Sequence, residues 1–304
     1  MRRISGRVLL TTAACIAAML VAACNEPRPG QEPSQSGMPS ALQNRQIPSV
    51  AALGDSITLG VNACGEAGKC GKASWSTGND AHVDSFVARL SEATGHRSQP
   101  INLAADGARA QDLPDQAAAA VADGASLVTI LVGANDACAR SLERMTPTAD
   151  FAAAVGEALA TLEAAPNPPV VFIASIPRLN ELLNANSENE AARQLWDRNK
   201  MCRSLLANPP SSATQDVSRR TAVDVRVNEY NVALAEQCAA ATRCIFDGGA
   251  VAAVNFTPAH ISSVDYFHPS REGQRAIAEA SWNALANALN HCELPPALKG
   301  DFGC

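Results

Sequence analysis

Ser56 is the residue of this 304-residue chain whose setting most favours chemistry. It follows Gly54 and Asp55 directly after the apolar run Val50-Ala51-Ala52-Leu53. A buried strand that ends in Gly-Asp-Ser presents the serine hydroxyl at its carboxyl end, where open α/β sheets carry their reactive groups. Because Gly-Asp-Ser is also ordinary turn chemistry, the rest of the chain has to decide between a nucleophile and a turn.

Three further polar blocks fall at the ends of expected elements. They are Asn102-Leu103-Ala104-Ala105-Asp106-Gly107, Gly133-Ala134-Asn135-Asp136 and Asp265-Tyr266-Phe267-His268-Pro269. With Gly54-Asp55-Ser56 they form an ordered set that resembles the SGNH, or GDSL-type, hydrolase family over about residues 48–290. Cys64 lies soon after Ser56, and Cys138 lies just after Asn135-Asp136. Both are similar to cysteines of the secreted lipase and esterase branch of the family.

The resemblance implies serine-dependent hydrolysis of carboxylic esters. Ser56 would be the nucleophile, and His268 the base that takes its proton and later returns it. Asp265 would accept the other imidazole N–H and stabilise the imidazolium. The oxyanion would be bound by the backbone N–H groups of Ser56 and Gly107 and by the side-chain amide of Asn135.

Other residues remain rivals for the acid and base positions. The rival bases are His82, His96, His260 and His291. Of these, His260 is the most serious, because it lies eight residues before His268 and could line the same pocket. Asp136 and Asp247 are rival orienting acids, and the family spacing favours Asp265.

No cofactor is expected from the motifs. The run Gly54-Asp55-Ser56-Ile57-Thr58 lacks the second glycine of the Gly-x-Ser-x-Gly elbow. No glycine pattern of a nucleotide-binding loop follows a strand. Serine-histidine-aspartate chemistry itself needs neither a metal nor a cofactor.

Strands and helices must alternate to bring these blocks together. Short apolar runs predict strands at residues 50–53, 101–104, 127–132, 170–174 and 244–246. Helical spacing predicts helices at residues 80–93, 111–122, 151–164, 188–206, 224–240 and 270–290. Such alternation implies a parallel sheet with helices on both faces. With the family resemblance, we expect a three-layer α/β sandwich with a five-stranded, mostly parallel sheet of flavodoxin-like arrangement.

Eight of the ten cysteines are candidates for disulfides. They are Cys64, Cys70, Cys138, Cys202, Cys238, Cys244, Cys292 and Cys304. Eight cysteines allow about a hundred connectivities. Closeness and order along the chain favour Cys64–Cys70, Cys138–Cys202, Cys238–Cys244 and Cys292–Cys304. A zinc site is the alternative, although the close pairs are spaced more widely than in the usual zinc knuckle.

The amino-terminal residues indicate export. Arg2, Arg3 and Arg7 precede an uncharged apolar stretch, which predicts a signal peptide over residues 1–23. Val21-Ala22-Ala23-Cys24 resembles the lipobox of bacterial lipoproteins, so Cys24 is a candidate lipidation site that would anchor the protein on the extracytoplasmic side of a membrane. Simple cleavage after Ala23, giving a secreted protein, is the alternative. Residues 24–47 predict a proline-rich tether, and residues 48–304 the catalytic domain.

Composition narrows the partners and substrates. The formal net charge of −6 argues against a nucleic-acid partner. Only 4% of the residues are aromatic, which disfavours a broad sugar-binding platform, although Trp75 or Trp196 could flank a site. We therefore expect a lipid or short-acyl ester as the substrate. The alternatives are an acetylesterase acting on polysaccharide or peptidoglycan, and a ligand-binding surface lipoprotein without catalytic activity; the sequence does not indicate an oligomeric state.

Overall fold

The computed structural model describes residues 39–304. The predicted signal peptide, the candidate lipidation site Cys24 and residues 24–38 of the predicted tether lie outside the described residues. The last part of that tether packs on the domain. Ser40–Leu42 forms a short 3₁₀ turn whose Leu42 is buried, and the Arg45 guanidinium lies 4.7 Å from the centre of the Phe302 ring.

Five strands form one sheet in which every pairing is parallel. They are β1 (Ser49–Gly54), β2 (Gln99–Asn102), β3 (Leu127–Leu131), β4 (Val170–Ile173) and β5 (Cys244–Phe246). Their order is β2-β1-β3-β4-β5, which confirms the expected flavodoxin-like arrangement. In such a sheet the loops after β1 and β3 diverge at the carboxyl edge, and ligands bind in the crevice that this creates.

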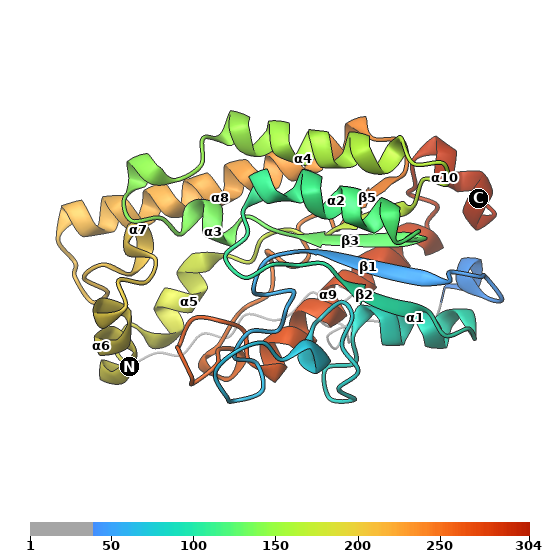
Figure 1. Ribbon diagram of the computed structural model, residues 1–304. Coiled ribbons are helices and arrows are strands. Elements are labelled where there is room, and N and C mark those ends of the chain that lie inside the picture. The colour runs from blue at the N-terminus through green and yellow to red at the C-terminus, as the bar shows by residue number, and fades with distance from the viewer. Residues whose placement is uncertain (1–38) are drawn as a thin grey trace, which may run out of the picture. The chain divides into compact units, whose positions relative to one another are not determined.

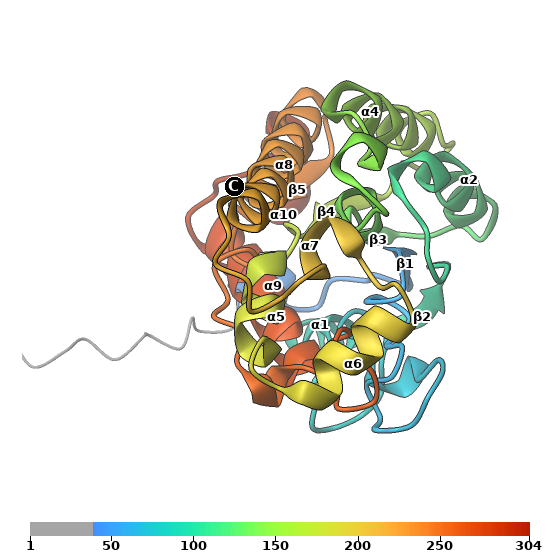
Figure 2. The same cartoon turned by 90° about the vertical axis from the view of Figure 1, so that its left-hand side faces the viewer.

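Helices cover both faces of the sheet, as expected from the apolar strands. One face carries α2 (Leu113–Ala122), α4 (Thr148–Glu163) and α8 (Thr214–Ala240); the other carries α1 (Phe86–Thr94) and α9 (Arg271–Asn290) (Figures 1 and 2). All six residues of β1 and all five of β3 are buried, because each strand is covered on both sides.

Shorter helices occupy the remaining surface. They are α3 (Ala134–Ala137), α5 (Leu179–Asn186), α6 (Glu190–Arg198), α7 (Arg203–Leu206) and α10 (Pro296–Phe302). In both Figure 1 and Figure 2, α5, α6 and α7 lie toward the end of the molecule at which the strands finish. These helices therefore frame the carboxyl edge of the sheet, where the motif residues of the sequence emerge.

Two predicted helices have different boundaries in the structure. The helix expected at residues 80–93 begins at Phe86, because Asp84 has a left-handed backbone with φ 49° and Ser85 then caps the helix by accepting a hydrogen bond from Ala88 N–H. The helix expected at residues 188–206 is divided into α6 and α7. Lys200 and Cys202 between them have φ values of 51° and 39°, which a continuous right-handed helix excludes.

One further helix is longer than expected. The predicted range 224–240 covers only the second part of α8, which begins at Thr214. Its first turns are polar, and Arg219 donates hydrogen bonds from its guanidinium to the carbonyl oxygens of Ser204 and Leu205 in α7. Tertiary contacts thus extend the helix beyond the part that its apolar spacing indicates.

All four favoured disulfides are present: Cys64–Cys70, Cys138–Cys202, Cys238–Cys244 and Cys292–Cys304. Cys138–Cys202 joins residues 64 positions apart and ties the end of α3 to the start of α7. Within residues 39–304, no helix has both the length and the apolar character needed to cross a membrane.

Candidate active site

Ser56 lies just beyond the carboxyl end of β1 and is 5% exposed. The end of this strand is held by Gln116 of α2, which is buried. Its Oε1 accepts a hydrogen bond from Gly54 N–H at 2.7 Å, and its Nε2 donates to Gly54 O at 3.0 Å. The strand and the helix behind it therefore fix the backbone from which the Ser56 hydroxyl projects.

Ser56, His268 and Asp265 form one hydrogen-bonded series. Ser56 Oγ lies 2.8 Å from His268 Nε2, and His268 Nδ1 lies 2.5 Å from Asp265 Oδ2. An ionised carboxylate can only accept, so His268 carries its proton on Nδ1 and accepts the hydroxyl hydrogen bond of Ser56 on Nε2. This is the arrangement in which an imidazole can remove the proton of a serine hydroxyl.

Asp265 is held as a carboxylate by several donors. Its Oδ1 accepts hydrogen bonds from the backbone N–H groups of Phe267 at 3.0 Å and His268 at 3.1 Å. Burial would raise the pKa of Asp265, but its hydrogen bond to His268, the charge of that imidazole and the two N–H donors together lower the pKa overall. Asp265 therefore stays ionised when His268 gains a proton.

The three groups expected to bind an oxyanion lie on successive loops at the carboxyl edge. Ser56 follows β1, Gly107 lies in the loop after β2 with φ 77°, and Asn135 lies in α3 after β3. Within residues 39–304, no protein group accepts a hydrogen bond from the backbone N–H of Ser56 or Gly107. Asn135 Nδ2 donates one of its two hydrogens to Ala108 O at 3.0 Å. That bond links the Asn135 amide to the loop of Gly107 and orients it as a donor.

A narrow apolar pocket opens beside Ser56. Its volume is about 40 Å³. Ser56, Asn135 and His268 form its polar end. The remaining lining is mostly apolar and comprises Ile57, Ala134, Pro177, Leu179, Leu182, Phe256, Ile261, Phe267 and Pro269, together with the charged Arg178. One water-sized group needs about 10–15 Å³ of such space, so the pocket admits about three groups of that size.

Asp55, next to the nucleophile, is fully buried. Its Oδ1 accepts a hydrogen bond from Ile57 N–H at 2.9 Å, while its Oδ2 has no hydrogen-bond partner among the described residues. Burial raises the pKa of Asp55 to about 7, against the opposing effects of the Ile57 hydrogen bond and the charge of His268. Its contact with the turn rather than with His268 makes it a structural residue of the loop.

The raised pKa predicts that Asp55 makes stability depend on pH. The folded protein keeps the Asp55 proton up to about pH 7, whereas the unfolded chain releases it near pH 4. The contribution of Asp55 to the stability of the wild type therefore falls as pH rises through that window. The free energy of unfolding of Asp55→Asn, minus that of the wild type, should therefore increase from pH 4 to pH 7. The increase should be at most about 4 kcal/mol, since each pKa unit corresponds to about 1.4 kcal/mol.

Urea unfolding at several pH values measures this effect. Asp123→Asn, at an exposed position at the end of α2, is the control for the loss of a surface charge. A difference between Asp55→Asn and the wild type that stays constant from pH 4 to pH 7 would contradict the prediction.

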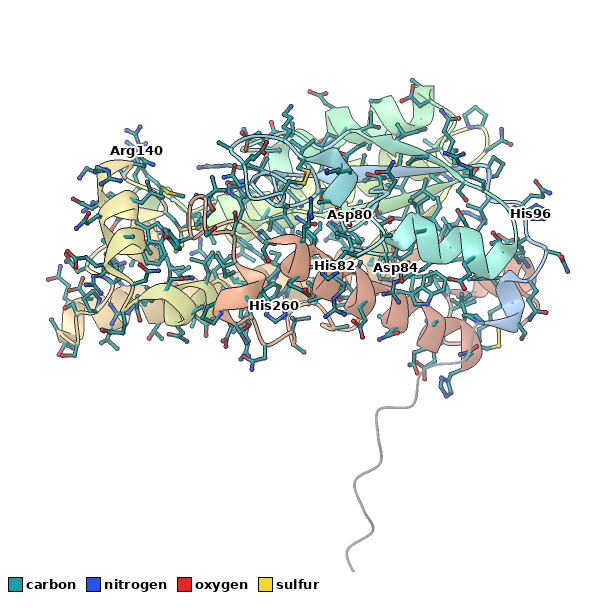
Figure 3. The ribbon with its side chains drawn as sticks, turned by 90° about the horizontal axis from the view of Figure 1, so that it is seen from below. Asp80, His82, Asp84, His96, Arg140 and His260 are labelled. Atoms are coloured by element: carbon teal, nitrogen blue, oxygen red, sulfur yellow. A yellow bond between two sulfur atoms is a disulfide. The ribbon has the colours of Figure 1, made fainter. Side chains whose placement is uncertain are left out.

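The rival histidines have partners other than Ser56, and three of them, His82, His96 and His260, are labelled in Figure 3. His82 Nε2 lies 2.7 Å from Glu272 Oε1 on the surface, and His291 Nδ1 contacts Asn287 O. His96 is exposed beside Gln46. His260 Nδ1 accepts a hydrogen bond from Thr257 N–H, and burial lowers the pKa of His260. Of the five histidines, His268 is the one whose ring contacts Ser56.

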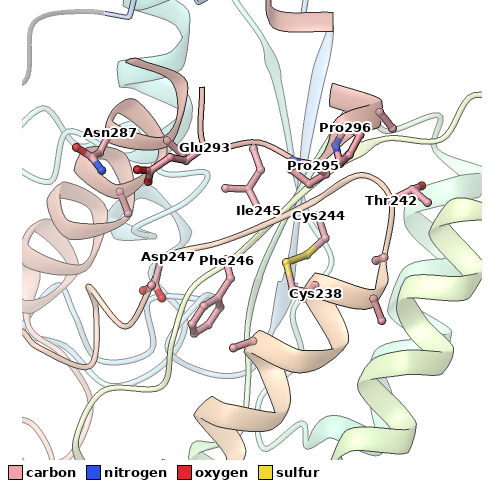
Figure 4. Close-up of a pocket in the computed structure, with 18 residues that line it drawn as sticks. Cys238, Thr242, Cys244, Ile245, Phe246, Asp247, Asn287, Glu293, Pro295 and Pro296 are labelled. Carbon is pink, nitrogen blue, oxygen red and sulfur yellow. A yellow bond between two sulfur atoms is a disulfide. The ribbon is translucent and has the colours of Figure 1, made fainter. Parts of the chain in front are cut away.

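The rival acids, Asp136 and Asp247, accept hydrogen bonds from groups other than a histidine ring. Asp136 is buried, and its Oδ2 accepts a hydrogen bond from Ala110 N–H at 3.1 Å. Asp247 Oδ2 accepts from Ser175 Oγ at 2.8 Å and from Val251 N–H at 2.9 Å. It lies at a second hollow of about 720 Å³, formed beside β5 by the ends of α8 and α9 (Figure 4). Neither carboxylate reaches an imidazole.

Two residues near the site are not predicted by the sequence. They are Asn62, whose Nδ2 donates to Asp265 Oδ2 at 2.7 Å, and Gln116, through its two bonds to Gly54. Trp75 and Trp196, the two candidates to flank a site, are each at most 1% exposed. Of these, Trp196 contacts the triad segment, because its Nε1 donates to Asp265 O at 3.2 Å. A polar residue on the buried side of α2 is the one signal that points to Gln116.

The comparisons with known proteins identify a family. The sequence pattern of the GDSL-like lipase/acylhydrolase family matches residues 52–276, a range that contains every motif block named above. The search of curated proteins returned no match.

Among solved structures, the chain is similar to LAE5, an alpha/beta hydrolase enzyme from the metagenome of Lake Arreo in Spain. Their identity is 18% over 80% of this chain and 96% of that chain, with a TM-score of 0.48. The extracellular lipase of Streptomyces rimosus is 18% identical over 79% and 99% of the two chains, with a TM-score of 0.43. A family 3 carbohydrate esterase of Clostridium thermocellum is 12% identical over 81% and 98%, with a TM-score of 0.43.

The family pattern covers well over half of the chain, and its motif blocks meet at one edge of a five-stranded parallel sheet. The resemblance found in the sequence is thereby confirmed. The chain belongs to the GDSL-like lipase/acylhydrolase family and is a hydrolase of esters.

Proposed function

We propose that this hydrolase cleaves carboxylic esters with short acyl groups through a covalent acyl-enzyme on Ser56. The observation that carries the proposal is the continuous series from Ser56 Oγ through His268 to Asp265 at the polar end of an apolar pocket. A ligand-binding protein would have no need for a base and an orienting acid aligned on one hydroxyl.

The first half of the reaction forms the acyl-enzyme. His268 Nε2 takes the proton of Ser56 Oγ as that oxygen attacks the ester carbonyl. The carbonyl oxygen gains negative charge, which the N–H groups of Ser56 and Gly107 and the Asn135 amide stabilise. His268 then gives its proton to the alcohol oxygen, which leaves as the carbon–oxygen bond breaks.

The second half regenerates the serine. A water molecule gives a proton to His268 Nε2 and attacks the acyl carbonyl, and the same donors stabilise the oxyanion. His268 returns the proton to Ser56 Oγ as the carboxylic acid is released. Asp265, whose pKa is lowered, stabilises the imidazolium in both halves.

The pocket supports a short acyl group. Leu179 and Leu182 of α5 close it from one side, and Phe256 and Phe267 also line it. A volume of about 40 Å³ matches an acetyl to butyryl chain. Apolar walls beside the hydroxyl favour the acyl part of an ester over a sugar ring.

The chain-length dependence of p-nitrophenyl ester hydrolysis tests this proposal. We expect kcat/KM to be highest for acyl chains of about two to four carbons and to fall by roughly 100-fold by eight carbons, since each misfitting methylene is costly. A fluorophosphonate should modify Ser56 alone, as read from the mass of the labelled peptide. A profile that rises toward long acyl chains would contradict the pocket assignment.

Acetylated oligosaccharides in the same assay distinguish the alternatives. Preference for them over p-nitrophenyl acetate would favour the acetylesterase. Absence of turnover on every ester, with no labelling of Ser56, would favour a ligand-binding protein and overturn the proposal.

A further inference from the structure

We infer that Asn62 is a positioning residue of the active site, which holds the Asp265 carboxylate against His268 from outside the triad. This inference rests on the proposed function. It is carried by a hydrogen bond between two loops that are distant in the sequence. Asn62 Nδ2 donates to Asp265 Oδ2 at 2.7 Å, across 203 positions.

Asn62 and His268 donate to the same carboxylate oxygen. Asp265 Oδ2 accepts from Asn62 Nδ2 and from His268 Nδ1, while Oδ1 accepts from the N–H groups of Phe267 and His268. Three of these four bonds come from the segment that carries Asp265 itself. Among the described residues, Asn62 is the donor to this carboxylate that comes from elsewhere in the chain. It therefore fixes the carboxylate relative to the rest of the molecule.

The orientation of the Asn62 amide is fixed by its other partner. Asn62 Oδ1 accepts a hydrogen bond from Gly68 N–H at 2.8 Å. Turning the amide over would place its oxygen against the Asp265 carboxylate and its NH₂ group against an N–H donor, which would break both bonds. The NH₂ group must therefore face Asp265.

The backbone of Asn62 connects the loops of the nucleophile and the base. Ser262 Oγ donates to Asn62 O at 2.7 Å, and Ser262 N–H donates to His268 O at 2.8 Å. On the other side, Val61 N–H donates to Ser56 O at 3.0 Å. Asn62 thus stands between the segment of Ser56 and the segment of His268, and its contacts set the distance between them.

The loop that presents Asn62 is closed on itself. Asn62 N–H donates to Gly68 O at 2.8 Å, and the Cys64–Cys70 disulfide joins the two sides of the same loop. Asn62 is 9% exposed and has φ 60°, a left-handed conformation that asparagine and glycine tolerate best. Asp is nearly isosteric with Asn and shares this tolerance, whereas it cannot donate to Asp265 when ionised.

Two substitutions remove the hydrogen-bond donor of Asn62 without changing the backbone conformation of its loop. Asn62→Asp keeps the acceptor for Gly68 N–H but puts a second carboxyl group against Asp265. Asn62→Gly removes the side chain at a φ that glycine adopts freely. Asn44→Asp is the matched control, because Asn44 also has φ 60° and is exposed before the amino end of β1, whereas Ser56 follows the carboxyl end of that strand.

We expect both Asn62 variants to lower kcat for p-nitrophenyl acetate by about 10- to 100-fold, the range typical of one hydrogen bond to a charged group. KM should stay within about twofold, because Asn62 does not line the pocket. The proton resonance of His268 Nδ1–H, measured by NMR without substrate, should shift in both variants. Asn44→Asp should change neither kcat nor the resonance.

The outcomes distinguish this inference from the proposed function. Unchanged kcat and an unchanged His268 resonance in both variants would overturn the inference. So would a loss of kcat with a lower melting temperature and an unchanged resonance, because that result assigns Asn62 to the fold alone. Absence of esterase activity in the wild type would overturn the proposed function, while the resonance would still report whether Asn62 positions the pair.

Discussion

Ser56→Ala is expected to lower kcat for ester hydrolysis by about 10⁴-fold or more and to leave the fold unchanged. The substitution removes the atom that would form the acyl-enzyme, and the remaining oxyanion donors give little rate enhancement by themselves. Ser56 Oγ makes its side-chain hydrogen bond to His268, so its loss leaves no buried donor without a partner. Steady-state kinetics with p-nitrophenyl acetate and a thermal melt measure the two effects.

Two controls sharpen this experiment. Ser218→Ala, at an exposed position of α8, should keep full activity. Because members of a triad act as a unit, adding His268→Gln to Ser56→Ala should cause almost no further loss. If Ser56→Ala kept more than about 1% of the wild-type kcat, another residue would have to supply the nucleophile.

Gly54→Ala is expected to destabilise the fold by about 4 kcal/mol or more, enough to unfold many domains of this size. Gly54 has φ 142°, and a Cβ at this position would lie 2.1 Å from Leu131 O and 2.9 Å from Thr58 Oγ1. Gly54 is in register with Leu131 of β3. The carbonyl therefore cannot move away without separating the two central strands.

Urea unfolding and the yield of soluble protein measure this loss. Gly124→Ala is the matched control, because Gly124 has φ 65° and a Cβ added there would meet no other atom within 4 Å; it should lose about 1–2 kcal/mol from backbone strain alone. If Gly54→Ala lowers the free energy of unfolding no more than Gly124→Ala does, the prediction is wrong, and β3 can shift away from the added Cβ at little cost.

The fold and the motif residues were predictable because their signals are local. Short apolar runs between helical segments define a parallel sheet, and each polar block follows or precedes such an element directly. Parallel strands end at a common edge, so Ser56, Gly107 and Asn135 had to approach one another. Their order and spacing then identified the family.

Residues whose role depends on distant partners were not predictable. In the sequence Asn62 has no feature that distinguishes it from other loop asparagines, because its role depends on its contact with Asp265. Trp196 is buried and donates to Asp265 O, although its amphipathic helix does not indicate what it covers. The break between α6 and α7 contains neither glycine nor proline. It occurs where the Cys138–Cys202 disulfide holds Cys202 in a left-handed conformation.

The separation of Ser56 and His268 by 212 positions has a consequence for the synthesis of the protein. During translation Ser56 is synthesised long before His268. A nascent chain, or one truncated before His268, therefore holds a serine hydroxyl with no base to activate it. A chain cleaved in the connecting segments would also recover the site only if both fragments stay associated. Ester hydrolysis is therefore a measure of full-length, correctly assembled protein, and proteolytic loss of the segment from His268 onward should silence the enzyme although all five strands remain in the chain.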